Sequence, residues 1–284
     1  SYNQLSGDIP GWVWKLPSLQ ALDLSNNRFS GRFPATLTHL SYFKLNQTSE
    51  RNQTTIYEDM PVTIKNTIFT LKYVLSARIY IDVSMNDLEG NIPESFGELQ
   101  GLKIANLSHN RISGTIPMAT FGRLMQLEVL DLSYNQLSGS IPQDLTSLAS
   151  LSTLNLESNQ LQGFIPVDAL HNLTALQVLR LSQNKLTGKI ESLDLSKLPN
   201  LRSFSVYENA FEGGLPAGLT ESKALVLFDV QRNKYLNGSL GDTATPDIAG
   251  LSNLRVLSVS YNQLSGDIPG WVWKLPSLQA LDLS

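Results

Sequence analysis

The stretch Leu127–Pro142, LEVLDLSYNQLSGSIP, is the most regular copy of a unit that recurs along this chain of 284 residues. Three leucines in the pattern LxxLxL predict a short β-strand that buries one of its faces. An asparagine follows the strand. A glycine and an isoleucine–proline pair come next, and glycine and proline favour turns. Almost every other segment of the chain is a variation on this unit.

The asparagine gives the period of the repeat. It recurs at Asn3, Asn27, Asn86, Asn110, Asn135, Asn159, Asn184, Asn209, Asn233 and Asn262. Seven of the nine intervals are 24 or 25 residues, and the other two, 59 and 29 residues, predict insertions. A fixed period in the twenties with this leucine pattern indicates a leucine-rich repeat, whose short coils stack into a solenoid.

Each part of the unit has a physical role. Leu127, Leu130 and Leu132 should point inward and meet their counterparts in neighbouring coils, because a single coil is too small to bury a core. Each buried leucine is worth roughly 1.5–3 kcal/mol. The asparagine amide should satisfy turn backbone groups in a stacked ladder. Gly139 supplies a turn conformation that a side chain would oppose, and Pro142 withholds a donor where the strand should end.

Composition excludes several classes of function. The net charge of −4 gives no reason to expect nucleic acid or an anionic membrane as partner. No apolar run reaches the ~18 residues that a membrane span needs. The absence of cysteine excludes disulfides and metal–thiolate sites. The three histidines, His39, His109 and His171, fall in separate coils, so no catalytic triad, metal centre or cofactor is predicted.

The predicted organisation is repeats over 1–40, an insertion over 41–77 and repeats again over 78–284. A β-rich run in the insertion, Val62–Leu75, argues for an ordered structure. Residues 260–284 are identical to residues 1–25 at all 25 positions. Ordinary units here diverge faster, so the identity suggests a tandem array, head-to-tail self-association, or overlapping sequence ends that were joined. In the repeat register, Val13 and Leu16 should face inward, and Trp12 and Trp14 outward.

These motifs resemble the plant-type leucine-rich repeat, LxxLxxLDLSxNxLSGxIPxxLxxL, over nearly every coil. The insertion is more specific: Tyr57–Asp59, Val62–Asn66 and Ile81–Pro93 resemble the island and the first repeat after it in plant receptor-like proteins. The segment Trp12–Leu16 also fits that family. The resemblance implies an α/β repeat, a right-handed solenoid with a parallel concave β-sheet, a second strand per coil and short 3-10 or loop segments on the convex side.

The resemblance also implies an extracellular, cell-surface recognition domain whose island shapes a ligand pocket near the concave face. It further implies a co-receptor kinase ectodomain docked on the four units after the island. The sequence departs from the family where a cysteine cap is expected, near Phe164–Pro166, because five further unit starts follow.

The concave face is the default binding surface of a solenoid. The positions four residues before each asparagine should face solvent on this surface. They are Asp23, Asp82, Asn106, Asp131, Asn155, Arg180, Ser205, Asp229, Ser258 and, at the equivalent position of the last unit, Asp282. The residues directly before the asparagines are Met85, His109, Tyr134, Ser158, Gln183, Glu208, Arg232 and Tyr261. Our candidate ligand-binding residues are Tyr57, Tyr80, Arg180, Arg202, Tyr207, Glu208, Arg232 and Arg255. All of them except Tyr57 and Tyr80 should cluster on neighbouring coils.

Five Asn-x-Ser/Thr acceptors for N-glycosylation suit a secreted protein, and they lie at Asn46, Asn52, Asn106, Asn172 and Asn237. Three functions remain open from the sequence. The first is a non-enzymatic ectodomain that binds a peptide, glycan or protein. The second is a structural solenoid that assembles end to end. The third is an inhibitor of cell-wall-degrading enzymes.

Overall fold

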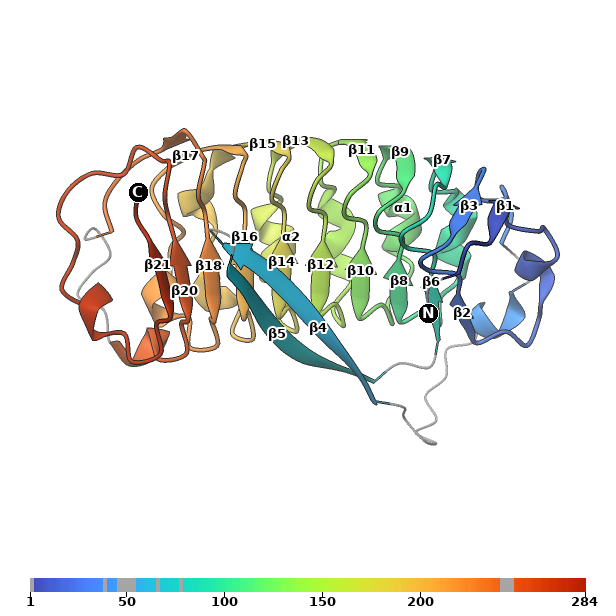
Figure 1. The fold of residues 1–284 in the computed structure, drawn as a ribbon, viewed down its shortest axis with the longest axis horizontal. Coiled ribbons are helices and arrows are strands. Elements are labelled where there is room, and N and C mark those ends of the chain that lie inside the picture. The colour runs from blue at the N-terminus through green and yellow to red at the C-terminus, as the bar shows by residue number, and fades with distance from the viewer. Residues whose placement is uncertain (1–2, 38–39, 45–54, 65–66, 77–78, 241–247) are drawn as a thin grey trace.

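The computed structural model describes residues 3–37, 40–44, 55–64, 67–76, 79–240 and 248–284. Within these residues the chain forms a row of stacked coils with two parallel sheets running along its length (Figure 1). Leu127, Leu130 and Leu132 are buried in the core, as their spacing predicted. The predicted leucine-rich repeat solenoid is therefore confirmed.

The concave sheet has ten strands, one from each coil, in simple sequence order apart from the hairpin between the first two. Its strands are β2 (Ala21–Asp23), β6 (Tyr80–Asp82), β8 (Ile104–Asn106), β10 (Val129–Asp131), β12 (Thr153–Asn155), β14 (Val178–Arg180), β16 (Ser203–Ser205), β18 (Leu227–Asp229), β20 (Val256–Ser258) and β21 (Ala280–Asp282). Equivalent residues of neighbouring coils pair in register, so each position of the repeat forms a straight row across the sheet.

A second parallel sheet follows the turn after each concave strand. Its strands are β7 (Glu89–Asn91), β9 (Arg111–Thr115), β11 (Gln136–Gly139), β13 (Gln160–Phe164), β15 (Lys185–Lys189), β17 (Ala210–Gly213) and β19 (Tyr235–Leu236), and the first coils add the pair β1 (Ser6–Asp8) and β3 (Arg28–Ser30). Strand β11 ends at Gly139, whose φ of 80° is the left-handed turn that glycine permits. The second strand implied by the Gly-x-Ile-Pro motif is therefore present.

Short helical turns complete the convex side. The 3-10 turns are η1 (Val13–Lys15), η2 (Ser41–Lys44), η3 (Glu94–Glu98), η4 (Gln143–Ser147), η5 (Ile190–Ser192), η6 (Leu195–Lys197), η7 (Leu219–Glu221), η8 (Ile248–Leu251) and η9 (Val272–Lys274), and the two α-helical turns are α1 (Met118–Phe121) and α2 (Val167–His171). A line of buried rings supports this side in the early coils. Trp14 contacts Phe33, Phe33 contacts Phe96 and Phe96 contacts Phe121, with centroid distances of 5.8, 6.3 and 5.7 Å.

The predicted asparagine ladder is present. In the coil of Asn135, the amide Nδ2 donates to the carbonyls of Leu107, Leu132 and Ser133 at 3.0, 3.1 and 3.1 Å. The amide Oδ1 accepts from the backbone N–H of Ile112 at 3.0 Å. Four backbone groups that leave the strand are thus satisfied by one side chain, and two of them belong to the preceding coil. The same four-bond pattern recurs at Asn86, Asn110, Asn159, Asn184, Asn209 and Asn233.

The insertion contains an antiparallel hairpin of β4 (Thr55–Ile64) and β5 (Thr67–Ser76). It forms a two-stranded sheet of its own and pairs with neither parallel sheet. Figure 1 shows it as a separate element outside the stack of coils. The first residues of the predicted insertion instead form η2 and continue a coil, since Phe43 is fully buried in the core.

The two identical 25-residue copies bury opposite tryptophans. In the first copy Trp14 is 3% exposed and packs on Phe33, while Trp12 is 64% exposed. In the second copy Trp271 is 7% exposed and Trp273 is 66% exposed. The first copy packs against the coil that follows it, and the second against the coil that precedes it. The same sequence therefore buries whichever ring faces a neighbouring coil, and the prediction that both rings point outward is wrong for one ring in each copy.

We expect tryptophan fluorescence to separate these environments. Acrylamide should quench Trp12 and Trp273 efficiently, and Trp14 and Trp271 poorly, because exposed and buried rings differ in their access to the quencher. Trp273→Phe should remove a readily quenched, red-shifted contribution, whereas Trp271→Phe should remove a protected, blue-shifted one. Equal quenching constants for the two lost contributions would contradict the opposite burial of the copies.

Candidate functional site

The residue directly before each ladder asparagine has a left-handed backbone. We call the eight residues that share this position and follow β6 to β20 the ridge: Met85, His109, Tyr134, Ser158, Gln183, Glu208, Arg232 and Tyr261. Their φ angles lie between 52° and 55°. Left-handed φ costs a non-glycine residue roughly 1–2 kcal/mol, so the surrounding bonds must hold it in place. Backbone bonds do so at Tyr134, whose N–H donates to the Glu157 carbonyl at 2.8 Å.

This conformation places one side chain per coil along the edge where the concave strands end. Neighbouring parallel strands are about 4.8 Å apart, so the ridge is a regular row of side chains with that spacing. None of its residues is a glycine or an asparagine, although those residues tolerate left-handed φ best. The row is therefore a surface whose side chains vary while its backbone stays constant.

Contacts join the ridge into two segments. At one end the rings of His109 and Tyr134 stack at 4.1 Å with only 8° between their planes. At the other end Gln183 Nε2 donates to Glu208 Oε2 at 2.9 Å, and Arg232 Nη1 donates to Glu208 Oε1 at 2.7 Å. The Arg232 guanidinium also lies over the ring of Tyr261, 5.3 Å from its centroid. The ridge thus changes from an aromatic plane to a polar, charged segment.

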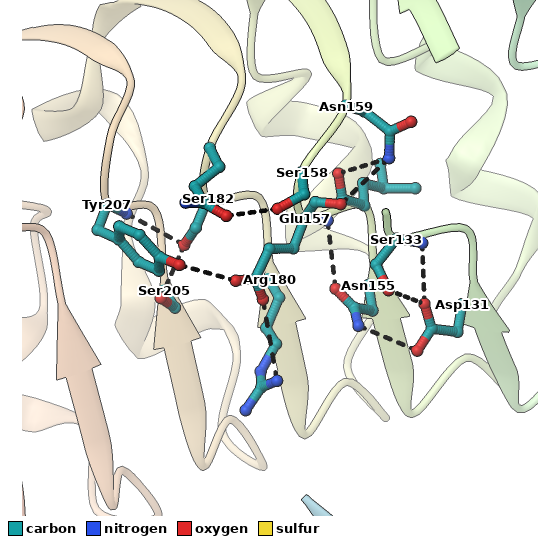
Figure 2. A network of polar contacts seen from close by, with 12 residues as sticks. Asp131, Ser133, Asn155, Glu157, Ser158, Asn159, Arg180, Ser182, Ser205 and Tyr207 are labelled. Carbon is teal, nitrogen blue, oxygen red and sulfur yellow. Dashed lines mark hydrogen bonds and ion pairs between the residues drawn. The ribbon is translucent and has the colours of Figure 1, made fainter. Parts of the chain in front are cut away.

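A buried polar network underlies the middle of the ridge (Figure 2). Glu157 Oε1 accepts a hydrogen bond from the Tyr207 hydroxyl at 2.9 Å. Glu157 Oε2 lies 3.9 Å from Arg180 Nη1, and these two side chains are only 10% and 12% exposed. The Tyr207 backbone N–H donates to Ser182 Oγ at 3.1 Å, and that hydroxyl contacts Ser205 Oγ at 2.8 Å. Strands β12, β14 and β16 therefore hold one another through polar side chains on the concave side.

Burial changes the ionisation of the tyrosines in this region. The pKa of Tyr207 is raised because burial disfavours the phenolate and because the Glu157 carboxylate is close. The pKa of Tyr134 is raised for the same two reasons, in the same order. At neutral pH both hydroxyls are protonated, and the Tyr207 hydroxyl donates to Glu157. They give the region donors without adding positive charge.

The row four residues before each asparagine, which is formed by the last residue of each concave strand, is more buried than its sequence position predicted. Five of its ten members are buried rather than solvent-facing, namely Asn155, Ser205, Asp229, Ser258 and Asp282. Larger residues two places further along the chain contribute to this cover: Gln231 donates through Nε2 to Asp229 Oδ2 at 3.2 Å. The open part of the concave side is consequently the ridge and the early strands.

The structure separates the candidate residues that the sequence grouped together. Glu208 and Arg232 lie in the ridge, and Arg180 and Tyr207 lie in the network beneath it. Arg202 and Arg255 directly precede β16 and β20, so they lie at the opposite ends of the strands from the ridge.

The other candidates lie toward the N-terminal coils. Tyr80 begins β6, several coils away, and its pKa is raised by burial and by Asp23 and Asp82. Tyr57 lies in β4 opposite Val74, and its side chain is outside the described part of the structure.

Sequence reasoning omitted Glu157 and Tyr134 from the candidates. The signal for Glu157 was available, because a serine or another small residue is usual two places before the asparagine, and Glu157 replaces it in the motif LESN. The stacking of Tyr134 on His109 was not visible, because it depends on the left-handed backbone of both residues.

The glycosylation candidates fall in different environments. Asn46 and Asn52 lie outside the described residues. Asn172 and Asn237 are exposed on the surface. Asn106 lies in β8, where Nδ2 donates to Asp82 Oδ2 at 3.1 Å and Oδ1 accepts from Ser108 Oγ at 2.8 Å. A glycan on Asn106 would replace the Nδ2 bond and place a sugar on the concave sheet.

We therefore expect chain expressed through a secretory pathway to carry N-glycans at Asn172 and Asn237 and to lack one at Asn106. Mass spectrometry of glycopeptides, with deglycosylation in ¹⁸O water, measures the occupancy of each site. Asn172→Gln should lower the mass by one glycan without changing the fold. Full occupancy at Asn106 with the concave sheet intact would contradict this expectation.

Two parallel sheets joined by an asparagine ladder define a leucine-rich repeat protein. Two family models match parts of this chain. One, described as "Leucine rich repeat", matches residues 114–161 and 245–284, and the other, described as "Leucine Rich Repeat", matches residues 18–40 and 150–173. Receptor-like protein 32 of Arabidopsis thaliana is 36% identical over 130 residues, which are 45% of this chain and 14% of that protein. The chain is similar to plant leucine-rich repeat receptor-like proteins. It spans less than a fifth of the length of the curated relatives it matches.

Solved structures with the same fold include two plant receptors in complex with partners. One is the plant peptide hormone receptor RGFR1 in complex with RGF2, with a TM-score of 0.77, 30% identity, and coverage of 97% of this chain and 37% of that chain. The other is the ectodomain of GASSHO1/SCHENGEN3 from Arabidopsis thaliana in complex with CASPARIAN STRIP INTEGRITY FACTOR 2, with a TM-score of 0.69, 29% identity, and coverage of 97% and 31%. Over its described residues, the present chain has no helix of a length and apolarity suited to crossing a membrane.

Proposed function

We propose that this chain is a non-enzymatic, extracellular recognition module that binds a peptide along the ridge and the adjoining concave sheet. The observation that carries the proposal is the ridge itself: one side chain per coil, held by a left-handed turn in a fixed, regularly spaced row. A preorganised row of this kind reduces the ordering cost of binding. The similarity to a plant receptor in complex with a peptide hormone supports the choice of a peptide.

The geometry sets the size and chemistry of the ligand. Seven intervals of about 4.8 Å make the ridge about 34 Å long, which matches an extended peptide of about ten residues at 3.3 Å per residue. The stacked rings of His109 and Tyr134 suit an aromatic or apolar side chain, because offset stacking adds to area burial. The Gln183–Arg232 segment suits hydrogen-bonding and charged groups. The hairpin β4–β5, with Tyr57, is included as a second contact element because long insertions in compact folds are usually functional or disordered.

The proposal can be tested with a phage-displayed library of random linear 12-residue peptides, followed by calorimetry on the synthesised best binder. Tyr134→Ala and Arg232→Ala should each weaken binding at least tenfold, since tyrosine and arginine dominate interface energetics. Matched controls are Tyr235→Ala, an exposed tyrosine on the second sheet, and Arg123→Ala, an exposed arginine after α1. Equal effects of the ridge variants and the controls, or an enriched binder that none of them weakens, would refute the proposal.

A further inference from the structure

Three short polar side chains stand side by side at one end of the concave sheet. In-register pairing places Ser258 of β20 between Asp229 of β18 and Asp282 of β21. Two strand spacings separate the aspartates, about 10 Å between Cα atoms. All three residues are buried, with exposed fractions of 0% for Ser258, 2% for Asp229 and 3% for Asp282. Two carboxylates thus flank a hydroxyl in a place that solvent does not reach.

This cluster is chemically incomplete. The Ser258 hydroxyl is buried and has no hydrogen-bond partner among the described residues. The Asp229 carboxylate accepts from the Gln231 backbone N–H and Nε2, both at 3.2 Å, and forms no ion pair within the described chain. A buried polar group without a partner is rare in folded proteins, and a buried charge without a counter-charge is costly.

The electrostatic surroundings of Asp229 are negative. Burial, and to a lesser extent the nearby carboxylates of Glu157 and Asp282, raise the pKa of Asp229 to about 6. A positive charge near Asp229 would relieve both its burial cost and its repulsion from these carboxylates.

The same row solves this problem differently in earlier coils. Asn106 Nδ2 donates to Asp82 Oδ2 at 3.1 Å, and Asn155 Nδ2 donates to Asp131 Oδ2 at 3.0 Å. There an amide reaches across to the neighbouring carboxylate and satisfies it. A serine side chain is shorter and ends in a single hydroxyl, and the Ser258 hydroxyl forms no such bond to either of its two neighbouring aspartates.

We propose that Asp229, Ser258 and Asp282 bind a hard divalent cation, with Ca²⁺ as the best match. Ca²⁺ takes six to eight oxygen ligands from carboxylates, neutral oxygens and water, in flexible geometry. The cluster contains oxygen donors and no histidine or cysteine, which disfavours zinc. Ser260, whose Oγ donates to Asp282 Oδ2 at 3.0 Å, adds a further hydroxyl oxygen. Gln231 is the most exposed of these residues, and its rotation gives an ion access.

The cluster differs from a dense acidic site. The described residues contain no group of three or more His, Cys, Asp and Glu residues arranged to hold a metal. Two carboxylates with neutral oxygens predict a modest dissociation constant, in the range of about 10⁻⁴–10⁻³ M that extracellular calcium modules show. Binding should raise the melting temperature, because the ion binds the folded chain and not the unfolded one.

The experiment is calorimetric titration of the chain with CaCl₂, together with thermal unfolding in CaCl₂ and in NaCl of equal ionic strength. We expect one Ca²⁺ per chain and a melting temperature that rises only with Ca²⁺. Asp229→Asn should weaken binding at least tenfold. Two controls should leave it unchanged: Asp131→Asn, from the same row, and Ser203→Ala, a buried serine with an unpartnered hydroxyl flanked by Val178 and Leu227.

A further variant keeps the test informative if Asp229→Asn fails to fold. Ser258→Asn should recreate the arrangement of Asn106 beside Asp82, so it should raise the melting temperature without Ca²⁺ and abolish the response to Ca²⁺. A titration without saturable binding would overturn the proposal. So would an undiminished Ca²⁺ response in Ser258→Asn, or an equal loss of binding in the Asp131→Asn control.

Discussion

Replacing Asn159 with alanine should lower the free energy of unfolding by about 3 kcal/mol. The buried Asn159 amide donates to the carbonyls of Leu132, Leu156 and Glu157 at 3.0, 3.2 and 3.2 Å. Its Oδ1 accepts from the backbone N–H of Leu137 at 3.0 Å. Alanine would leave these groups buried without partners, and each such group costs roughly 1–3 kcal/mol. Urea unfolding followed by circular dichroism measures the loss.

The control is Asn253→Ala, which removes a single exposed hydrogen bond to the Lys223 carbonyl at 2.9 Å. We expect that change to stay within about 0.5 kcal/mol, as surface substitutions usually do. The comparison isolates the ladder from the general effect of losing an asparagine. Similar losses in Asn159→Ala and Asn253→Ala would mean that the ladder adds nothing to the stability of the stack.

The ladder and the core could be predicted from sequence because each depends on local spacing repeated many times. The interval between asparagines fixes the coil length, and the leucine positions fix which face is buried. Insertions do not disturb these rules, so β2 and β6 pair in register although the hairpin lies between them.

Burial that depends on neighbouring coils could not be predicted in the same way. Trp12 and Trp271 share one local sequence, yet one is exposed and the other buried. Asp229 and Asp131 share one repeat position, yet only Asp229 is buried. For the tryptophans the deciding factor is a neighbouring coil, which a single unit of sequence does not contain, and Asp229 is in addition bonded by the Gln231 side chain of its own coil.

The candidate site was predicted in part. The ridge positions were identified as a column, but their left-handed backbone was not, because no glycine or asparagine marks it at Tyr134 or Glu208. Arg202 and Arg255 were grouped with Arg232 because all are basic residues on neighbouring coils. Arg202 and Arg255 come before their strands, whereas Arg232 comes after its strand. The length of a strand therefore separates them, because each residue of a strand advances about 3.3 Å.

Replacing Arg180 with alanine should lower the free energy of unfolding by about 3 kcal/mol, because it leaves the Glu157 carboxylate buried without its cation. The control is Arg111→Ala. Arg111 Nη2 lies only 2.6 Å from Asp87 Oδ1, but these side chains are 63% and 44% exposed. Exposed pairs are worth about 0–1 kcal/mol. The longer, buried contact should therefore matter more than the shorter, exposed one.

The double variant Arg180→Ala/Glu157→Gln tests the cause of this loss. A neutral amide removes the uncompensated charge and can still accept a hydrogen bond from the Tyr207 hydroxyl, which now lies 2.9 Å from Glu157 Oε1. We expect the double variant to recover at least about 2 kcal/mol relative to Arg180→Ala, because removing both partners avoids the stranded charge. Urea unfolding of the four proteins in the cycle measures the coupling. If the double variant is as unstable as Arg180→Ala, the loss comes from the packing of the arginine side chain, and the network under the ridge is not electrostatic in origin.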